Sequence, residues 1–154
     1  FTNLNLDEIN NINQEFISDP KKRYAQKMLA DNLIEVVHGK DGLSEAKKIT
    51  EYFFNENYND LSEQNILDLS ESFSSFEEDK SITESQVNLG RFLTDNNVFN
   101  SMSEMRRMFE QGALYINGNR ITDSQTLLDK NLFLKGKFMI IRLGSKKYYL
   151  TVLK

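Results

Sequence analysis

The sequence is poor in the residues on which most covalent and metal chemistry depends. Its 154 residues include no cysteine, one proline and one histidine, His38. The absence of cysteine excludes disulfides, thiolate nucleophiles and cysteine-ligated zinc, and is typical of a reducing compartment. A single histidine argues against a histidine metal site or a catalytic triad. The chain has no apolar run of roughly 18 residues, so we expect no membrane-spanning helix, and no signal-peptide pattern opens it.

Acidic and basic residues are divided unevenly along the chain. Residues 1–84 contain 8 Lys and Arg against 18 Asp and Glu, a net charge of −10. Residues 85–154 contain 11 Lys and Arg against 5 Asp and Glu, a net charge of +6. Such a split favours nucleic-acid binding by the basic half, although the net charge of small domains also varies without a functional reason.

The acidic half has the pattern of a helical segment. Apolar residues at helical spacing predict helices over residues 6–16, from Pro20 to a stop at Gly39, over 44–54, and a short one from about residue 61. A Ser-, Glu- and Asp-rich stretch follows at residues 70–84, where the charge changes sign. We therefore predict a helical segment at 1–69, an acidic linker at 70–84 and a separate domain at 85–154.

The basic half has the pattern of an α+β domain. We expect helices over residues 84–95 and 101–110, followed by strands at 113–116, 121–122, 132–134, 138–143 and 147–153. Gly144-Ser145 would form a two-residue turn between the last two strands. The predicted fold is a small α+β unit with helices packed on an antiparallel sheet.

Residues 101–119 are the most informative stretch of this domain. Ser101 and Glu104 have the spacing of a capping box at a helix start, and Gly112 would end that helix. Asn117-Gly118 is the preferred dipeptide of a type I′ hairpin turn. The apolar face of the helix leaves Arg106 and Arg107 on its polar side. Adjacent arginines on a compact helix–hairpin favour binding to RNA phosphates, because the guanidinium presents paired donors to phosphate oxygens.

An alternative role for the two arginines is helix stability. Arg106 lies four residues before Glu110, and Arg107 lies three residues after Glu104, so both could form ion pairs within the helix. Exposed pairs of this kind are weak, and a polyanion would displace them easily.

The sequence offers little for catalysis. It has no phosphate-binding glycine loop, and the acidic run Glu77-Glu78-Asp79 is typical of a solvated segment rather than of a paired acid site. We predict no catalytic residue and no metal site. The other basic residues expected to follow an RNA backbone are Arg91, Arg120, Lys135, Lys137, Lys146 and Lys147.

Three stretches carry a family resemblance. Residues 101–123, SMSEMRRMFEQGALYINGNRITD, resemble the RNA-binding unit at the C-terminus of bacterial tyrosyl-tRNA synthetases, a variant of the S-four (alpha-L) fold. KRYAQKMLA at 22–30, VVHG at 36–39 and AKKIT at 46–50 resemble the helical anticodon-arm segment that precedes this unit in the same enzymes. The tail from Gly136 is similar to the C-terminus of the family.

The resemblance implies a fragment that binds tRNA for tyrosine without chemistry of its own. It would grip the variable arm and the anticodon stem, while ATP and magnesium would belong to an absent catalytic domain. Family RNA-contact positions correspond to Ser101, Ser103, Arg106, Arg107 and Asn117, whereas Met102 stands where the family usually has Lys or Arg. A homodimeric parent, a monomeric fragment and a bacterial cytoplasmic location, with an organelle as the alternative, are also implied.

Two other interpretations stay open. The chain could be a protein-interaction module whose acidic half docks a basic partner. It could also be an S-four-like domain of a different RNA-modifying or ribosome-associated protein.

Overall fold

The chain forms two units, Phe1–Glu51 and Tyr52–Lys154. We describe them separately from a computed structural model that covers residues 4–145 and 147–154. In chain order the elements are α1 (Leu6–Ser18), η1 (Pro20–Lys22), α2 (Tyr24–Phe54), η2 (Tyr58–Asp60), α3 (Glu63–Ser70), β1 (Ser74–Glu78), η3 (Lys80–Glu84), α4 (Leu89–Asp95), α5 (Met102–Glu110), β2 (Leu114–Ile116), β3 (Asn119–Ile121), η4 (Lys130–Leu132), β4 (Phe138–Leu143) and β5 (Lys147–Leu153). None of the helices in these described ranges has the length and hydropathy needed to cross a membrane.

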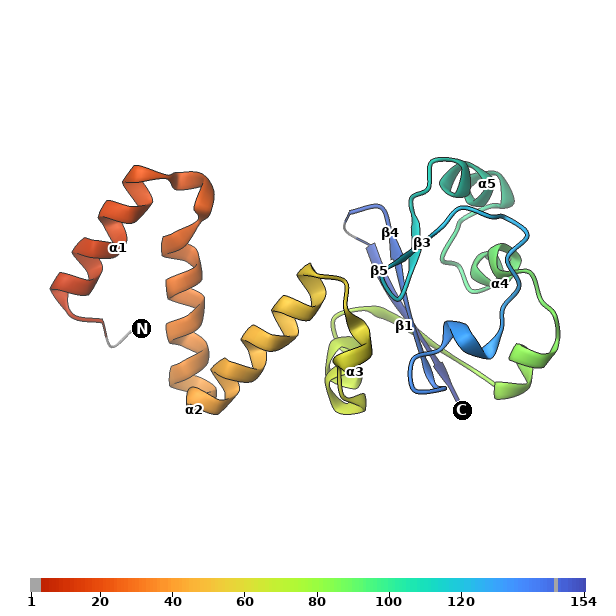
Figure 1. Cartoon of the computed structure of the whole chain (residues 1–154), viewed down its shortest axis with the longest axis horizontal. Helices are drawn as coiled ribbons and strands as arrows, with labels where there is room; N and C mark the ends of the chain where they lie inside the picture. Colours follow the sequence, from red (N-terminus) through yellow and green to blue (C-terminus); the bar gives the residue numbers. More distant parts are fainter. Residues whose placement is uncertain (1–3, 146) are drawn as a thin grey trace. The chain divides into compact units, whose positions relative to one another are not determined.

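The first unit is helical, as predicted. Asn5 caps α1 through a capping box with Glu8, and Pro20 opens the η1 turn that follows. The backbone of α2 leaves helical geometry at Gly39, with φ 72° and ψ −177°, so α2 consists of two helices that meet at this glycine. The predicted stop at Gly39 is therefore confirmed as a sharp bend (Figure 1).

The second unit is built on a five-stranded sheet in the order β1-β5-β4-β2-β3. The pairs β5–β4, β4–β2 and β2–β3 are antiparallel, whereas β1 runs parallel to β5 with Ser74 opposite Tyr149. The sheet is therefore mixed: the predicted antiparallel pairing holds for β2 to β5, and β1 adds a parallel strand. The α+β class is confirmed.

The parallel strand comes from the segment expected to be a linker. Within residues 70–84 the structure has β1 and η3, and the side chain of Phe76 points into the core against Phe92, with 5.9 Å between ring centroids. One alternating aromatic was enough to hold an otherwise Ser- and Glu-rich edge strand, because edge strands tolerate polar residues. The Ser- and Glu-rich composition of residues 70–84 therefore gave no sign of this strand.

Helices cover both faces of the sheet in this unit (Figure 1). Met139, Ile141 and Leu143 of β4 point into the core shared with α4 and α5. Phe138 and Ile140 alternate to the opposite face, where Tyr58, Leu61 and Ile66 are also buried, on η2, α3 and the turn between them. Residues 52–70 thus pack on the sheet, although the sequence placed them with the N-terminal helices.

An arginine joins this back layer to the sheet. Nη2 of Arg142 in β4 lies 2.7 Å from Oε1 of Glu56, and Nη1 donates to the carbonyl oxygen of Gly144 at 2.6 Å. The guanidinium also lies over the ring of Tyr115, 3.7 Å from its centroid. Its side chain is only 15% exposed, so these contacts compensate for most of its lost hydration.

Some local features agree with the sequence and others differ. Asn117 and Gly118 both have positive φ, as a type I′ turn requires, and connect β2 to β3. The β4–β5 hairpin forms, with Leu143 paired to Lys147. The predicted Gly144-Ser145 turn lies in this connection together with Lys146, which is outside the described residues. In place of the expected strand at 132–134, Leu132 ends η4 and Leu134 forms only an isolated antiparallel bridge with Phe138.

The domain boundary can be tested by truncation. We expect residues 52–154 to unfold cooperatively on heating, because both faces of their sheet are covered. A chain of residues 85–154 lacks β1 and α3 and exposes Phe138, Ile140 and Leu150, each worth roughly 1.5–3 kcal/mol of burial. It should show no cooperative transition by circular dichroism. Equal melting temperatures for the two chains would contradict this arrangement.

Candidate nucleic-acid interface

Helix α5 begins with a cap that differs in one respect from the expected one. Ser101 Oγ accepts a hydrogen bond from the backbone N–H of Glu104 at 3.1 Å, as predicted. The carboxylate of Glu104 does not return this bond to Ser101. It accepts from the backbone and side-chain N–H groups of Asn100, at 2.8 and 2.7 Å. The predicted reciprocal capping box was therefore wrong, because the carboxylate of Glu104 binds Asn100, one residue before Ser101.

The carboxylate of Glu104 is held in its charged form. Its hydrogen bonds from Asn100 lower its pKa below the ordinary value, and the positive charges of Lys147 and Arg107 act in the same direction. The charge of Lys147, the first residue of β5, therefore acts on the start of α5 and links two of the predicted RNA-binding segments electrostatically.

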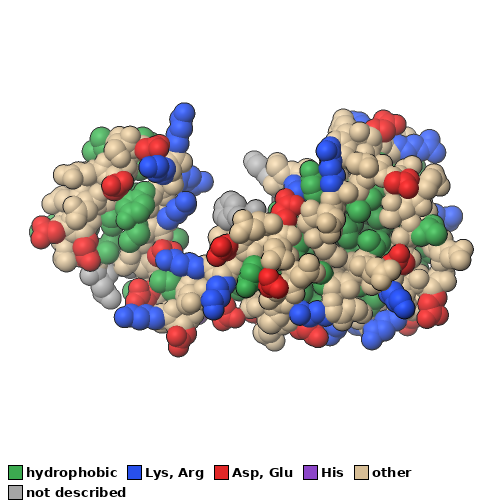
Figure 2. Space-filling view, viewed as in Figure 1, with side chains coloured by type: hydrophobic (Ala, Val, Ile, Leu, Met, Phe, Trp, Pro, Cys, Tyr) green, Lys and Arg blue, Asp and Glu red, His purple; other side chains and the backbone are tan. Residues whose placement is uncertain are grey.

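The polar side of α5 presents its arginines to solvent. Met105 and Phe109 are buried beneath the helix, whereas Ser103, Arg106 and Arg107 are exposed. Figure 2 shows basic side chains around this end of the molecule, interspersed with acidic ones. Within the described residues neither arginine forms an ion pair within 4.0 Å, so the expected alternative pairs with Glu110 and Glu104 do not form.

Arg120 has a structural role at the other end of α5. Its Nε donates to the carbonyl oxygen of Gly112 at 2.7 Å and its Nη2 to that of Gln111 at 2.9 Å. The guanidinium lies so close to Gly112 that an added Cβ there would be 2.1 Å from Nη2. Arg120 thus caps the helix and joins it to β3, which leaves only part of its donor set for a ligand.

The side chain of Asn117 also has a structural role. Its amide nitrogen donates to the carbonyl oxygen of Leu132 at 2.8 Å, and its side-chain oxygen accepts from the backbone N–H of Ile140 at 2.9 Å. Its own backbone N–H donates to the carbonyl oxygen of Ile140. These bonds hold the turn against β4. They are a sufficient reason for an asparagine at position 117, with no need for an RNA contact.

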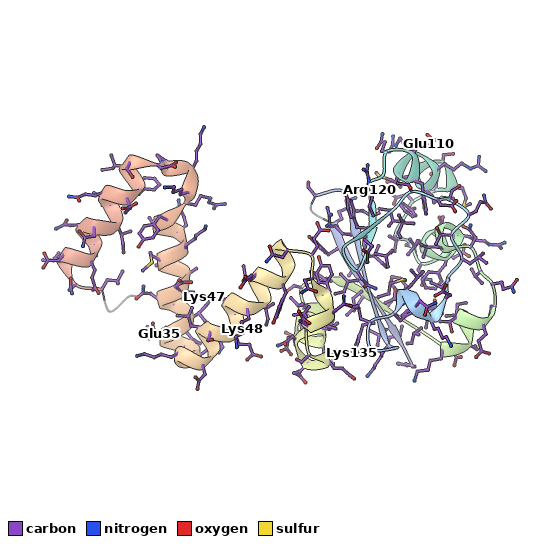
Figure 3. The ribbon with its side chains drawn as sticks, viewed as in Figure 1. Glu35, Lys47, Lys48, Glu110, Arg120 and Lys135 are labelled. Atoms are coloured by element: carbon purple, nitrogen blue, oxygen red, sulfur yellow. The ribbon has the colours of Figure 1, made fainter. Side chains whose placement is uncertain are left out.

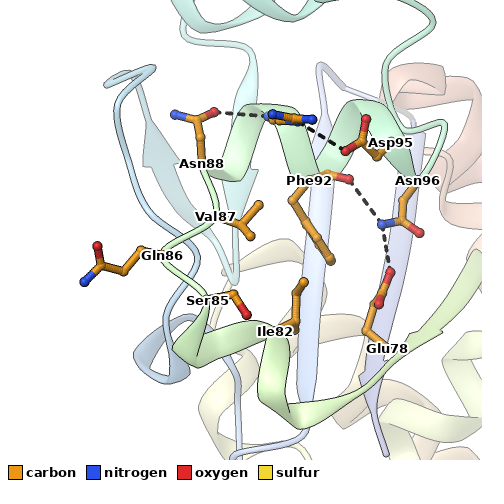
Figure 4. Close-up of a pocket in the computed structure, with 10 residues that line it drawn as sticks. Glu78, Ile82, Ser85, Gln86, Val87, Asn88, Phe92, Asp95 and Asn96 are labelled. Carbon is orange, nitrogen blue, oxygen red and sulfur yellow. Dashed lines mark hydrogen bonds and ion pairs between the residues drawn. The ribbon is translucent and has the colours of Figure 1, made fainter.

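The remaining predicted residues lie away from α5. Lys135 lies at the opposite end of the sheet from Arg120 (Figure 3). Lys137 directly precedes β4, and its Nζ lies 3.8 Å from Oε2 of Glu63. Arg91 is exposed on α4, pairs with Asp95 at 3.7 Å and lines an open pocket with Glu78, Ile82 and Phe92 (Figure 4). Lys146 lies outside the described residues. The structure therefore gathers Ser101, Ser103, Arg106, Arg107 and Lys147, with Arg120 at the far end of the helix.

The sequence did not reveal the back layer. Arg142, a basic residue within the predicted strand at 138–143, lies against Glu56 and Tyr115 in the structure. A hint was present in the position of Arg142 within an otherwise apolar strand, where an unpaired charge would be costly. Met102 is 42% exposed at the start of α5, where a longer basic residue would reach solvent. Within the described ranges, no group of three or more His, Cys, Asp or Glu is placed to hold a metal ion.

Comparison with known proteins gives a consistent result. Residues 68–151 match the family model described as the tyrosine–tRNA ligase SYY-like C-terminal domain. The whole chain is 38% identical to a tyrosine–tRNA ligase of Lactobacillus delbrueckii subsp. bulgaricus and 35% identical to one of Leuconostoc mesenteroides, covering 36% of each. A solution structure of a tyrosyl-tRNA synthetase C-terminal domain matches 61% of the chain and 91% of its own, with 30% identity and a TM-score of 0.49. The chain thus spans about a third of the length of these curated relatives.

The structural role of Asn117 can be tested by substitution. Asn117→Ala should lower the free energy of unfolding by roughly 2–3 kcal/mol, because it orphans a buried backbone donor and places alanine at positive φ. Asn119→Ala is the matched control, since Asn119 is exposed in the same hairpin and should change stability little. Urea unfolding measures both. Equal stabilities for the two variants would contradict the structural assignment.

Proposed function

The chain belongs to the family of tyrosine–tRNA ligase SYY-like C-terminal domains, and from this premise we propose that it is the tRNA-binding portion of a tyrosyl-tRNA synthetase. The observation that supports this most is the surface formed by Ser101, Ser103, Arg106, Arg107 and Lys147, called here the α5 surface. It combines exposed cationic side chains on α5 and β5 with the start of a helix.

The α5 surface suits a phosphate backbone. Arg106 and Arg107 are exposed and without ion pairs among the described residues, so no local bond has to break before they bind phosphate oxygens. The first turn of α5 offers backbone N–H groups, whose partial positive charge also attracts phosphate. Lys147 extends this charge onto β5. Phosphate contacts of this type position an RNA without reading its sequence.

The mechanism is one of positioning. A folded RNA is recognised largely by its shape, its phosphates and its 2′-hydroxyl groups, and a rigid helix on a sheet can match such a shape. In this proposal the α5 surface holds the variable arm of tRNA for tyrosine and helps to place the anticodon stem. The basic residues at the opposite end of the sheet, Lys135 and Lys137, lie outside this primary surface.

The chemistry would belong to the remainder of the parent protein. We propose that the parent attaches tyrosine to its tRNA with ATP and magnesium in a separate catalytic domain. A homodimeric parent in the bacterial cytoplasm is part of the same proposal. The relatives that support it are named tyrosine–tRNA ligases, and this chain covers about a third of their length.

A charge reversal tests the α5 surface. Arg106→Glu with Arg107→Glu should weaken binding of tRNA for tyrosine by about 10- to 100-fold, because two cations become two repulsive charges. The slope of log affinity against log salt should become shallower by about 2, one unit for each lost phosphate contact. Filter binding or fluorescence anisotropy over a salt series measures both quantities.

Lys130→Glu with Lys135→Glu is the matched control, since it makes the same change in net charge at two exposed lysines outside the α5 surface. We expect the control to bind tRNA nearly as tightly as the unmodified chain. Equal weakening by both double variants would mean that only overall charge matters. Failure of the unmodified chain to bind any tRNA would favour a protein-interaction module instead.

A further inference from the structure

An acidic residue of the back layer is connected to the α5 surface by bonds through the sheet. Glu56 lies between the end of α2 and η2, and its Oε1 accepts from Nη2 of Arg142 in β4 at 2.7 Å. The side chain of Arg142 is nearly buried, and that of Glu56 is partly exposed. Such a pair is screened less by salt than a surface pair, and loss of one partner leaves a charge without compensation.

The backbone of Glu56 has a conformation that most residues avoid. Its φ is 53°, in the left-handed region, and the N–H of Asn57 donates to the carbonyl oxygen of Tyr52 at 3.0 Å. This bond is typical of a Schellman motif at the end of a helix, where the left-handed position is usually a glycine. A residue with a side chain is costly there. The ion pair with Arg142 offsets that cost and is a physical reason for glutamate at position 56.

A short series of hydrogen bonds leads from Arg142 to α5. Nη1 of Arg142 donates to the carbonyl oxygen of Gly144 at 2.6 Å, in the connection between β4 and β5. The N–H of Gly144 donates to the carbonyl oxygen of Ala113 at 2.8 Å. The N–H of Ala113 in turn donates to the carbonyl oxygen of Met108, in α5, at 2.9 Å. Gly144 is therefore held between the arginine and the segment that follows α5.

The same connection leads into the cationic start of β5. This strand begins at Lys147, which belongs to the α5 surface and pairs with Leu143 of β4. The side chain of Arg142 is only 15% exposed, so it is too buried to be a main contact for an RNA phosphate. Any effect of Arg142 on RNA binding is therefore indirect. It acts through Gly144, from which the chain continues to Lys147 and to which the end of α5 is bonded.

We propose that Glu56 is a positioning residue for RNA binding. Its charge holds the guanidinium of Arg142 on the carbonyl oxygen of Gly144, and this bond keeps Lys147 and the end of α5 in the arrangement that binds phosphates. The inference rests on the proposed function and adds to it a residue with the same sign of charge as RNA. Simple electrostatics predicts the opposite, because removal of a negative charge strengthens binding to a polyanion. The two explanations therefore predict opposite signs for one substitution.

Neutralising Glu56 tests this role. Glu56→Gln in the full chain should weaken binding of tRNA for tyrosine by about three- to tenfold, because Arg142 loses its counter-charge and releases Gly144. The slope of log affinity against log salt should become shallower by about 1, as the contact of Lys147 is lost. Glu71→Gln is the matched control, since it removes one negative charge from an exposed glutamate of the same unit. Its affinity should be unchanged or slightly higher.

A double variant separates positioning from stability. Glu56→Ala should lower both the melting temperature and the affinity for tRNA, because it leaves a nearly buried arginine without its counter-charge. Adding Arg142→Leu should restore much of the melting temperature, since an apolar side chain suits this position. The carbonyl oxygen of Gly144 still lacks its donor, so tRNA binding should stay weak. Recovery of affinity together with melting temperature would overturn the positioning role.

The two glutamine variants keep the inference distinct from the proposed function. If the unmodified chain binds tRNA and Glu56→Gln binds it as tightly as Glu71→Gln does, the positioning role of Glu56 alone is wrong. If the unmodified chain binds no tRNA, the proposed function is wrong as well. Glu56→Gln preserves the size of the side chain, so it provides the comparison even if Glu56→Ala does not fold.

Discussion

The guanidinium of Arg142 is the point on which the second unit depends. It connects four parts of the fold: its own strand β4, Tyr115 on β2, the carbonyl oxygen of Gly144 in the following turn, and Glu56 ahead of η2. An arginine in a nearly buried strand position is costly unless its charge is paired. Here Glu56 pairs the charge and the carbonyl oxygen of Gly144 accepts from Nη1, whereas Nε is buried without a hydrogen-bond partner among the described residues. Glu56 supplies that pairing, so residues 52–70 become the back layer of the sheet rather than the end of a separate helical segment.

This back layer has a consequence for recognition. With η2 and α3 on one face of the sheet and α4 and α5 on the other, the solvent-exposed side of α5 carries Arg106 and Arg107.

The sequence predicted the local elements better than their assembly. Helical spacing, Gly39, the Asn117-Gly118 turn and strands β4 and β5 were visible because each depends on nearby residues. Strand β1 was missed because its partner, β5, lies more than seventy residues away and its composition is that of a linker. Among the site residues, Arg106 and Arg107 were predicted as exposed. The structural uses of Asn117 and Arg120 depend on carbonyl groups that no sequence pattern reveals.

The central claim is that RNA lies along α5 and the start of β5. Backbone amide chemical shifts of the isotope-labelled chain, recorded during titration with tRNA for tyrosine, test it most directly. The account predicts that the largest changes occur at residues 101–107 and at 147–149, with little change at 135–137 at the opposite end of the sheet. Changes concentrated at 135–137, or spread evenly over all basic residues, would contradict it.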